Sequence, residues 1–230
     1  RAREGACLIV TISSKTADVS QLLQKIPINL FDRIIVFDDG AKDDAVRFIR
    51  DQGIEVIPLK GQDALHLVQS EQVAIEQVNL LFFTADGRYD PDDISRLLLT
   101  LERGKDMVIA SRFLSGGARH DRNQRVRYRS MGNRGFTLLA NILFYGNISD
   151  TLCTLRAIRK QRLVEAKLDE NDLMGFYQLS LSAIKRNWKV ADLPVVELMN
   201  SGLNNRGKIV FDGLRLIRVL FKEWWRSRFD

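Results

Sequence analysis

The chain has 230 residues, and 45% of them are hydrophobic, which is enough to bury the core of a single α/β domain. Its formal net charge of +6 favours anionic partners such as nucleoside diphosphates, phospholipid surfaces or nucleic acid. Two cysteines and two histidines exclude a disulfide framework and a histidine-rich metal site, and no apolar run approaches the roughly 20 residues of a transmembrane helix.

Continuous apolar runs are separated by amphipathic helical patterns through the first half of the chain. Such runs are typical of strands covered on both faces. Strands that alternate with helices predict right-handed βαβ units, and therefore a mainly parallel twisted sheet flanked by helices. The strands are expected at 6–12, 33–39, 55–59, 78–84 and 107–110, with helical patterns around 19–26, 46–53, 63–77 and 90–104.

The strand at 78–84 ends abruptly at an acidic turn that contains Asp86 and Gly87. Open α/β folds bind ligands at the carboxyl edge of the sheet, so this strand would deliver the Asp86 carboxylate to a binding site. The next helix is expected to begin with Asp90 as its N-cap and Pro91 at its first position. The alternative is that Asp86 and Gly87 form only a turn.

A basic segment follows the strand at 107–110. Arginines recur from Arg119 to Arg134 and are interrupted by one acid, Asp121. Because arginine suits bidentate contact with phosphate, this segment is a candidate for holding phosphate groups beside the sheet. A solvated basic loop is the alternative. The chain then returns to a helical pattern, whose apolar face is formed by Leu138, Leu139, Ile142 and Leu143.

The last third of the chain adds a turn into a strand at 150–158, a helix at 173–186 and a strand at 189–198. Pro194 lacks the N–H group that a central strand would use, which predicts that the last strand lies at an edge. The polar loop at 201–208 carries Arg206 and Lys208, which can hold a diphosphate.

The terminal helix has an apolar stripe beside a basic stripe. One interpretation places this helix at a membrane interface, with the apolar stripe toward lipid. The other docks the apolar stripe on the domain and leaves the basic side chains in water. The apolar stripe consists of Leu214, Ile217, Phe221, Trp224 and Trp225, and the basic stripe of Arg215, Arg218, Lys222 and Arg226.

Several short motifs span nearly the whole chain in order: DDG at 38–40, TADGRYDPDDI at 84–94, SRFLSGG at 111–117, DTLCTLRAIRK at 150–160 and RGK at 206–208. Together they resemble the family 2 glycosyltransferases, especially the polyprenyl-phosphate sugar synthases of the dolichol-phosphate mannose synthase type. The resemblance implies a GT-A fold in a single domain over 1–230. A nucleotide-sugar-binding half would cover about 1–112 and an acceptor half about 113–210, followed by the basic amphipathic helix at 211–230.

The resemblance also implies roles for acidic residues on the donor side. Asp38 and Asp39 are the acids at the end of the second strand, where the family contacts the nucleoside. Asp86 is the second acid of the family's DxD motif, which holds a divalent metal on the donor diphosphate. The implied cofactor is Mg²⁺ or Mn²⁺, because both accept carboxylate and phosphate oxygens as ligands.

Basic residues would neutralise the departing nucleoside diphosphate. The resemblance assigns this role to Arg112, Arg206 and Lys208, and it places Asp150 near the acceptor. Asp86, Arg112 and Asp150 are therefore the expected catalytic residues. The implied reaction is inverting transfer of a sugar from a nucleoside diphosphate to a polyprenyl phosphate at an anionic membrane surface.

The chain departs from the family's pattern around the donor. Lys15 stands where the family has an acid after the first strand, and Thr84 replaces the first acid of DxD. These departures favour an alternative, in which a catalytically degenerate relative acts as a binding or scaffolding subunit. Nucleic-acid binding through the basic segment explains the charge but not the carboxylates, so we do not expect it.

The expected location follows from composition. Few cysteines predict a reducing compartment, and the first residues lack the pattern of a signal peptide. We therefore expect a cytoplasmic protein, either soluble or peripheral on the cytosolic face of a membrane.

Overall fold

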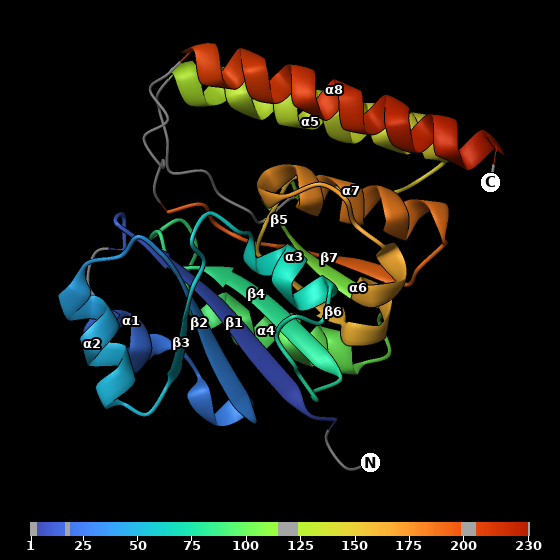
Figure 1. The fold of residues 1–230 in the computed structure, drawn as a ribbon. Helices are drawn as coiled ribbons and strands as arrows, with labels where there is room; N and C mark the ends of the chain where they lie inside the picture. Colours follow the sequence, from blue (N-terminus) through green and yellow to red (C-terminus); the bar gives the residue numbers. More distant parts are fainter. Residues whose placement is uncertain (1–3, 17–18, 115–123, 199–205, 230) are drawn as a thin grey trace.

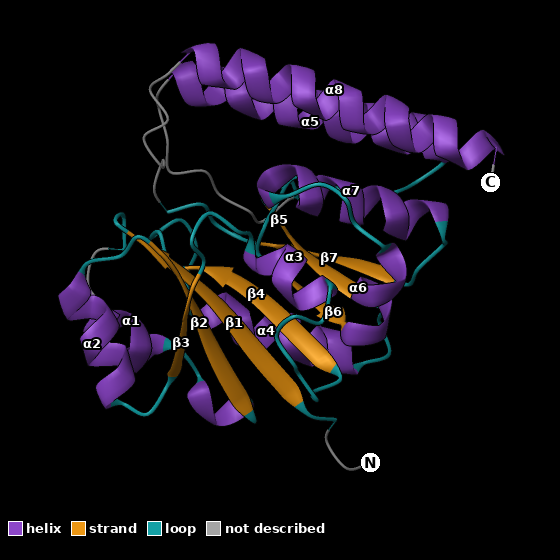
Figure 2. Cartoon of the chain, viewed as in Figure 1, coloured by secondary structure: helices purple, strands orange, loops and turns teal. Residues whose placement is uncertain are grey.

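The computed structural model describes residues 4–16, 19–114, 124–198 and 206–229, with side chains left out at 124–130, 206–210 and 229. Its centre is a seven-stranded sheet in the order β3-β2-β1-β4-β6-β5-β7 (Figure 2). The strands are β1 (Ala6–Ser13), β2 (Arg33–Asp39), β3 (Glu55–Pro58), β4 (Asn79–Thr84), β5 (Met107–Ser111), β6 (Arg156–Arg159) and β7 (Val190–Pro194).

The sheet is parallel except for β6, which pairs antiparallel with both β4 and β5. The strand order reverses at β1, because β2 and β3 lie on one side of it and β4 on the other. Such a reversal opens a crevice at the carboxyl ends of the strands. The expected mainly parallel α/β sheet is confirmed, and Pro194 does lie in an edge strand.

Helices cover both faces of the sheet. Figure 1 shows α4 (Asp92–Glu102) behind the strands, with α3 (Ala64–Gln69) and α6 (Lys160–Ala166) on the opposite face. At the β2–β3 edge lie α1 (Val19–Lys25) and α2 (Asp43–Asp51), and the turn η1 (Ile28–Leu30) precedes β2. The α7 helix (Asp172–Lys185) packs Phe176 edge to face on Phe82 of β4, with ring centroids 5.7 Å apart.

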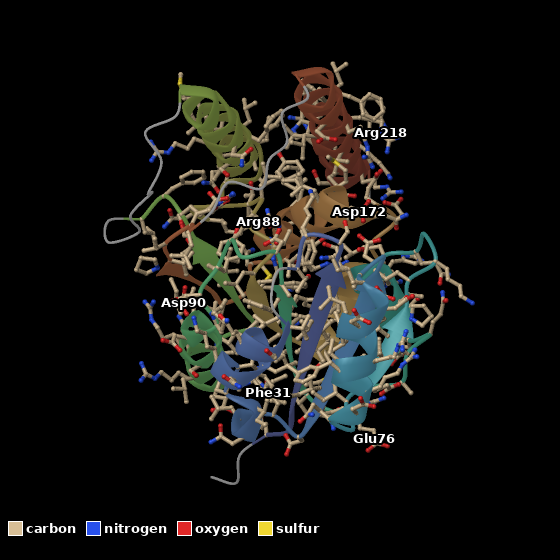
Figure 3. The ribbon with its side chains drawn as sticks, turned by 90° about the vertical axis from the view of Figure 1, so that its left-hand side faces the viewer. Phe31, Glu76, Arg88, Asp90, Asp172 and Arg218 are labelled. Atoms are coloured by element: carbon tan, nitrogen blue, oxygen red, sulfur yellow. The ribbon has the colours of Figure 1, made fainter. Side chains whose placement is uncertain are left out.

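The helices α5 (Gln124–Phe144) and α8 (Arg206–Phe229) form an outer layer. They run side by side in the same direction above α7 (Figures 1 and 3). Among the described side chains of α8, the buried apolar ones are Leu216, Val219 and Leu220. No helix in the described segments is both long and apolar enough to cross a bilayer.

Three residues of the basic stripe of α8 form ion pairs with acids of the domain. Arg218 lies 2.8 Å from Glu170, and Lys222 and Arg226 lie 2.8 and 2.9 Å from Asp169. Burial acts to raise the pKa of Asp169, but hydrogen bonds from Lys222, Arg226 and Gln178 together outweigh it and lower this pKa to about 2. The stripe therefore attaches α8 to the turn before α7.

The face of α8 that packs on the domain carries Leu216, Val219 and Leu220, and most of the apolar stripe faces outward. Leu214, Ile217, Phe221 and Trp225 are all exposed, Trp225 by 62%. The interpretation that docks the apolar stripe on the domain, with its arginines in water, is therefore wrong. The apolar face expected on α5 is also largely exposed, at Leu138, Leu139 and Ile142, with Tyr145 at the end of that helix.

One expected helix is shorter than its pattern. The helix predicted over 63–77 ends at Gln69, and Ser70 and Glu71 turn out of it. Glu71 has a positive φ of 56°, a left-handed conformation that a helix does not continue through. The segment up to β4 is irregular but still buries Ile75.

Candidate functional site

A cavity of about 490 Å³ opens at the carboxyl ends of β1 and β4. This volume falls within the range of small-molecule sites. Its floor includes Thr11 and Thr84, which pair in register across β1 and β4. Its other walls come from the starts of α3 and α7 and, above them, from α5 and α8. In Figure 3, Arg88 and Asp172 lie at this end of the sheet, whereas Phe31 and Glu76 lie at the opposite end.

The Asp86 carboxylate lies in the cavity wall directly after β4, as the sequence predicts. Its Oδ2 accepts a hydrogen bond from Nε of Arg88 at 2.5 Å, and its Oδ1 accepts one from the Arg88 backbone N–H at 3.2 Å. The side chains of Asp86 and Arg88 are 8% and 15% exposed. Gly87, at a φ of +77°, allows the chain to reverse within this short loop.

Arg88 was not among the expected site residues. Its burial acts to lower the pKa of the guanidinium, but the neighbouring Tyr89 and Asp86 shift that pKa upward overall. Arg88 therefore keeps its positive charge at the cavity wall. The residue was visible in the acidic turn, but its orientation toward Asp86 follows from the fold of the loop.

Of the two acids that end β2, only Asp39 lines the cavity. Asp38 turns away, and its Oδ1 accepts a hydrogen bond from the backbone N–H of Ala41 at 2.7 Å. Asp39 is exposed and pairs in register with Ser13 at the end of β1. Lys15 follows in the next turn and is an exposed residue of the same wall. Asp39, Lys15 and Asp86 therefore line the same cavity. They lie at or just after the ends of β2, β1 and β4, which are neighbours in the sheet.

Two further carboxylates line the cavity, Asp63 and Asp172, and neither was predicted. Asp63 caps α3, because its Oδ2 accepts a hydrogen bond from the His66 backbone N–H at 3.2 Å. Burial, and next the charge of Asp172, raise the pKa of Asp63. Asp172 begins α7 at a φ of +52°, a strained value for a non-glycine residue. The N-cap pattern at Asp63 was readable in the sequence, but its closeness to Asp172 was not.

The upper wall includes residues of the outer helices. Asn133 and Phe136 of α5 line it, as do Asp212 and Arg215 of α8. Sequence reasoning had placed Arg215 on a surface stripe. Its contribution to the cavity depends on how α8 is rotated on the domain, which no local pattern specifies.

Two expected catalytic residues, Arg112 and Asp150, lie close together but do not line the cavity. Nε and Nη2 of Arg112 donate to the two carboxylate oxygens of Asp150 at 2.7 and 2.9 Å. Both side chains are buried, and Glu197 lies 3.9 Å from Arg112. The pair joins the end of β5 to the loop before β6. Its catalytic role stays a prediction.

The side chains of the other predicted basic residues lie outside the described part of the structure. Arg206 begins α8 and Lys208 follows it, but their side chains are not described. The same holds for the arginines between 119 and 129. Arg134 is described, and its guanidinium lies over the Phe113 ring, 4.9 Å from the ring centroid.

The residues present do not fit a divalent metal. Each Asp86 oxygen already accepts a hydrogen bond from Arg88, and Thr84 offers a hydroxyl where a second carboxylate is expected. Within the described segments no group of three or more His, Cys, Asp or Glu residues is arranged to hold a metal ion. A cation brought to Asp86 would also meet the guanidinium charge.

The sequence of this chain is similar to those of known glycosyltransferases. Residues 19–165 match the family described as glycosyl transferase family 2. A polyprenol monophosphomannose synthase of Mycolicibacterium smegmatis is 31% identical over 119 residues, which are 50% of this chain and 44% of that protein. A dolichyl-phosphate hexose transferase of Haloferax volcanii is 24% identical over 161 residues, 70% of this chain and 68% of that protein.

Solved structures share the fold at low identity. A glucosyl-3-phosphoglycerate synthase from Mycobacterium tuberculosis, in complex with UDP, has a TM-score of 0.73 and 14% identity, and the match covers 97% of this chain and 81% of that one. The same enzyme with Mn²⁺, UDP and phosphoglyceric acid gives a TM-score of 0.71, 16% identity, and coverage of 97% and 79%. These matches confirm the expected GT-A fold.

Proposed function

Since this chain belongs to glycosyl transferase family 2, we propose that it transfers a sugar from a nucleoside diphosphate to a polyprenyl phosphate at a membrane surface. The observation that carries the proposal is the position of the cavity. Its floor is the carboxyl edge of β1 and β4, where open α/β sheets take nucleotides, and its roof includes α8, whose outer face is apolar.

The donor side of the cavity offers groups suited to a nucleotide sugar. Asp39 can accept hydrogen bonds from the hydroxyl or base N–H groups of the nucleoside. Lys15 and Arg88 bring positive charge to the same wall, where a diphosphate would lie. Arg215 adds a further cation from the roof. Fixed cations of this kind stabilise the negative charge that builds up on a departing diphosphate.

The acceptor side is supported by the exposed apolar face of α5 and α8. A lipid-linked phosphate has its reactive group at the bilayer surface, so an enzyme acting on it has to bring its cavity to that surface. Large exposed side chains on both helices would enter the interface, including Leu138, Ile142, Tyr145, Leu214, Phe221 and Trp225. The positive net charge of the protein would favour anionic lipids.

The reaction needs little proton transfer from the protein. A phosphate monoester has a second pKa near about 6, so it is already an anionic nucleophile at neutral pH. Its oxygen would form a bond to the anomeric carbon as the bond from that carbon to the diphosphate breaks, which inverts the configuration. Positioning and charge stabilisation would supply most of the rate.

The names of the relatives agree with this substrate class. The two curated relatives reported above are named for polyprenol- and dolichyl-phosphate chemistry, although the match covers only 44% of the first. The solved structure with the same fold contains UDP. It therefore supports a nucleotide-sugar donor, but it does not support a lipid-linked acceptor.

The test is a transfer assay with purified protein and vesicles that contain a short polyprenyl phosphate. Labelled GDP-mannose, UDP-glucose and UDP-N-acetylglucosamine are supplied separately, and label in the organic phase is counted. We expect transfer from one donor and a loss of about tenfold or more in Asp39→Ala. Asp51→Ala changes an exposed aspartate at the end of α2 and is the matched control. Donor binding without any transfer would contradict the proposal.

A second candidate function is favoured by the pairing of Asp86 with Arg88. If that contact, together with Thr84 and Lys15, has abolished donor chemistry, the protein is a binding or scaffolding subunit. It would then bind nucleotide or lipid without turnover. The same assay, combined with nucleotide binding measured by calorimetry, distinguishes the two functions.

A further inference from the structure

We propose that Arg88 takes the place of the divalent cation in this chain, so that the donor diphosphate is bound by side-chain cations alone. The inference rests on the proposed function, because it concerns how that same site holds its donor. Arg88 would thus fill the role that the family resemblance assigned to Mg²⁺ or Mn²⁺. This inference is based on the geometry of the loop after β4.

Asp86 and Arg88, two positions apart in the chain, are joined by two hydrogen bonds. The guanidinium Nε lies 2.5 Å from Oδ2, and the backbone N–H of Arg88 donates to Oδ1 at 3.2 Å. Both contacts come from the turn at Gly87. The backbone of Arg88 is also held from a distance, because the Leu198 N–H donates to the Arg88 carbonyl oxygen at 2.9 Å. Low exposure of both side chains strengthens the attraction, because little water screens it.

The arginine has donors left for a ligand. Among the described residues, Nε is the only guanidinium nitrogen of Arg88 with a hydrogen bond, and it points to Asp86. The two terminal nitrogens carry the remaining N–H groups of the guanidinium fork. Arg88 lines the cavity, so these groups can donate to phosphate oxygens in the bidentate manner that arginine favours.

Three residues of the cavity act in the same direction. Thr84 is uncharged where the family has an acid, whereas Arg88 and Lys15 place positive charges in the same wall. A metal would lose a carboxylate ligand and would be repelled by the cations, while a diphosphate would gain partners. Asp86 then serves as the residue that positions Arg88, in the way a carboxylate behind a metal-binding histidine positions that ligand.

The test measures binding of UDP and GDP by calorimetry, in EDTA and in Mn²⁺. We expect the wild-type protein to bind one of them equally well, within about twofold, in both buffers. Arg88→Ala is expected to weaken binding in EDTA by about tenfold or more. Added Mn²⁺ should restore part of the affinity in this variant, because Asp86 is then free to bind the ion. Arg96→Ala removes an exposed arginine of α4 and is the matched control.

The outcomes separate the inference from the proposed function. Wild-type binding that appears only with Mn²⁺ would overturn the role of Arg88 and leave the proposed transferase standing. Absence of nucleotide binding in both buffers would contradict both. The comparison of buffers uses the wild-type protein, so it does not depend on the folding of any variant. Electron paramagnetic resonance adds a direct readout, because wild-type protein should leave Mn²⁺ free in solution.

Discussion

Arg112, directly after β5, and Asp150, in the loop before β6, form a buried bidentate ion pair with contacts of 2.7 and 2.9 Å. The same carboxylate also accepts a hydrogen bond from the Leu152 backbone N–H. The pair therefore sets the path of the chain between β5 and β6, next to the cavity but outside its lining.

Breaking this pair should destabilise the protein. Removing one partner of a buried ion pair leaves an unpaired charge and costs about 3–5 kcal/mol. We expect Arg112→Ala and Asp150→Ala each to lower the free energy of unfolding in urea by about that amount. Glu55→Ala, which breaks a largely exposed pair with Arg33, should cost less than about 1 kcal/mol. Loss of sugar transfer at unchanged stability would instead support the catalytic prediction for Arg112 and Asp150.

The exposed face of α8 should control attachment to membranes. Burying a large apolar side chain contributes about 1.5–3 kcal/mol, so Phe221→Ser with Trp225→Ser should weaken binding to anionic vesicles by about tenfold or more. Leu99→Ser changes an exposed leucine on α4 and is the control. Co-sedimentation with vesicles measures both. Equal binding of the double variant and the wild type would show that this face does not meet lipid.

Gly175 should be required by close packing between α7 and α3. A Cβ atom at this position would lie 2.7 Å from the Glu170 carbonyl oxygen and 3.2 Å from the Leu65 side chain. Gly175→Ala should therefore lower the free energy of unfolding by about 1–3 kcal/mol. Gly135→Ala is the control, because its Cβ would meet nothing within 4 Å. This substitution in α5 should stabilise by about 0.5–1 kcal/mol, because alanine favours helix.

The pKa of Asp63 should make stability depend on pH. Burial, and next the charge of Asp172, raise this pKa above the ordinary value of 3.8, so the folded protein holds the proton more tightly than the unfolded chain. As pH rises from below 3.8, the unfolded chain ionises first, and the contribution of Asp63 to stability falls until the folded group has ionised too. At neutral pH, Asp63 is ionised in both states, and its burial lowers the free energy of unfolding by the full amount that corresponds to its pKa shift.

Asp63→Asn should remove this cost while keeping an oxygen to cap α3. We expect the variant to be more stable than the wild type at pH 7 and to lose the advantage below pH 3.8. Urea unfolding across this range measures the difference, with Asp51→Asn as the control for removing one negative charge. A variant that is less stable than the wild type by the same amount at every pH would show that ionisation of Asp63 does not affect stability, and would contradict this prediction.

Much of the fold follows from local patterns. The apolar runs predicted the central strands β1, β2, β4 and β5, since residues such as Ile35, Leu81 and Val108 have to be covered on both faces. Parallel strands bring their carboxyl ends to one edge, and Asp39 and Asp86, from the ends of β2 and β4, accordingly line the same cavity. The helix predicted over 63–77 was too long because nothing local marked the left-handed turn at Glu71.

The sequence alone determined the strands, their acidic ends and the family, because these depend on the order of neighbouring residues. Only the tertiary structure decided which face of α8 meets solvent, because that depends on Glu170 and Asp169, which hold Arg218 and Lys222 from about 50 residues away. The same holds for the closeness of Asp63 to Asp172 and for the burial of Arg112 with Asp150. Contacts between distant residues are set by packing and charge in three dimensions, and no local pattern records them.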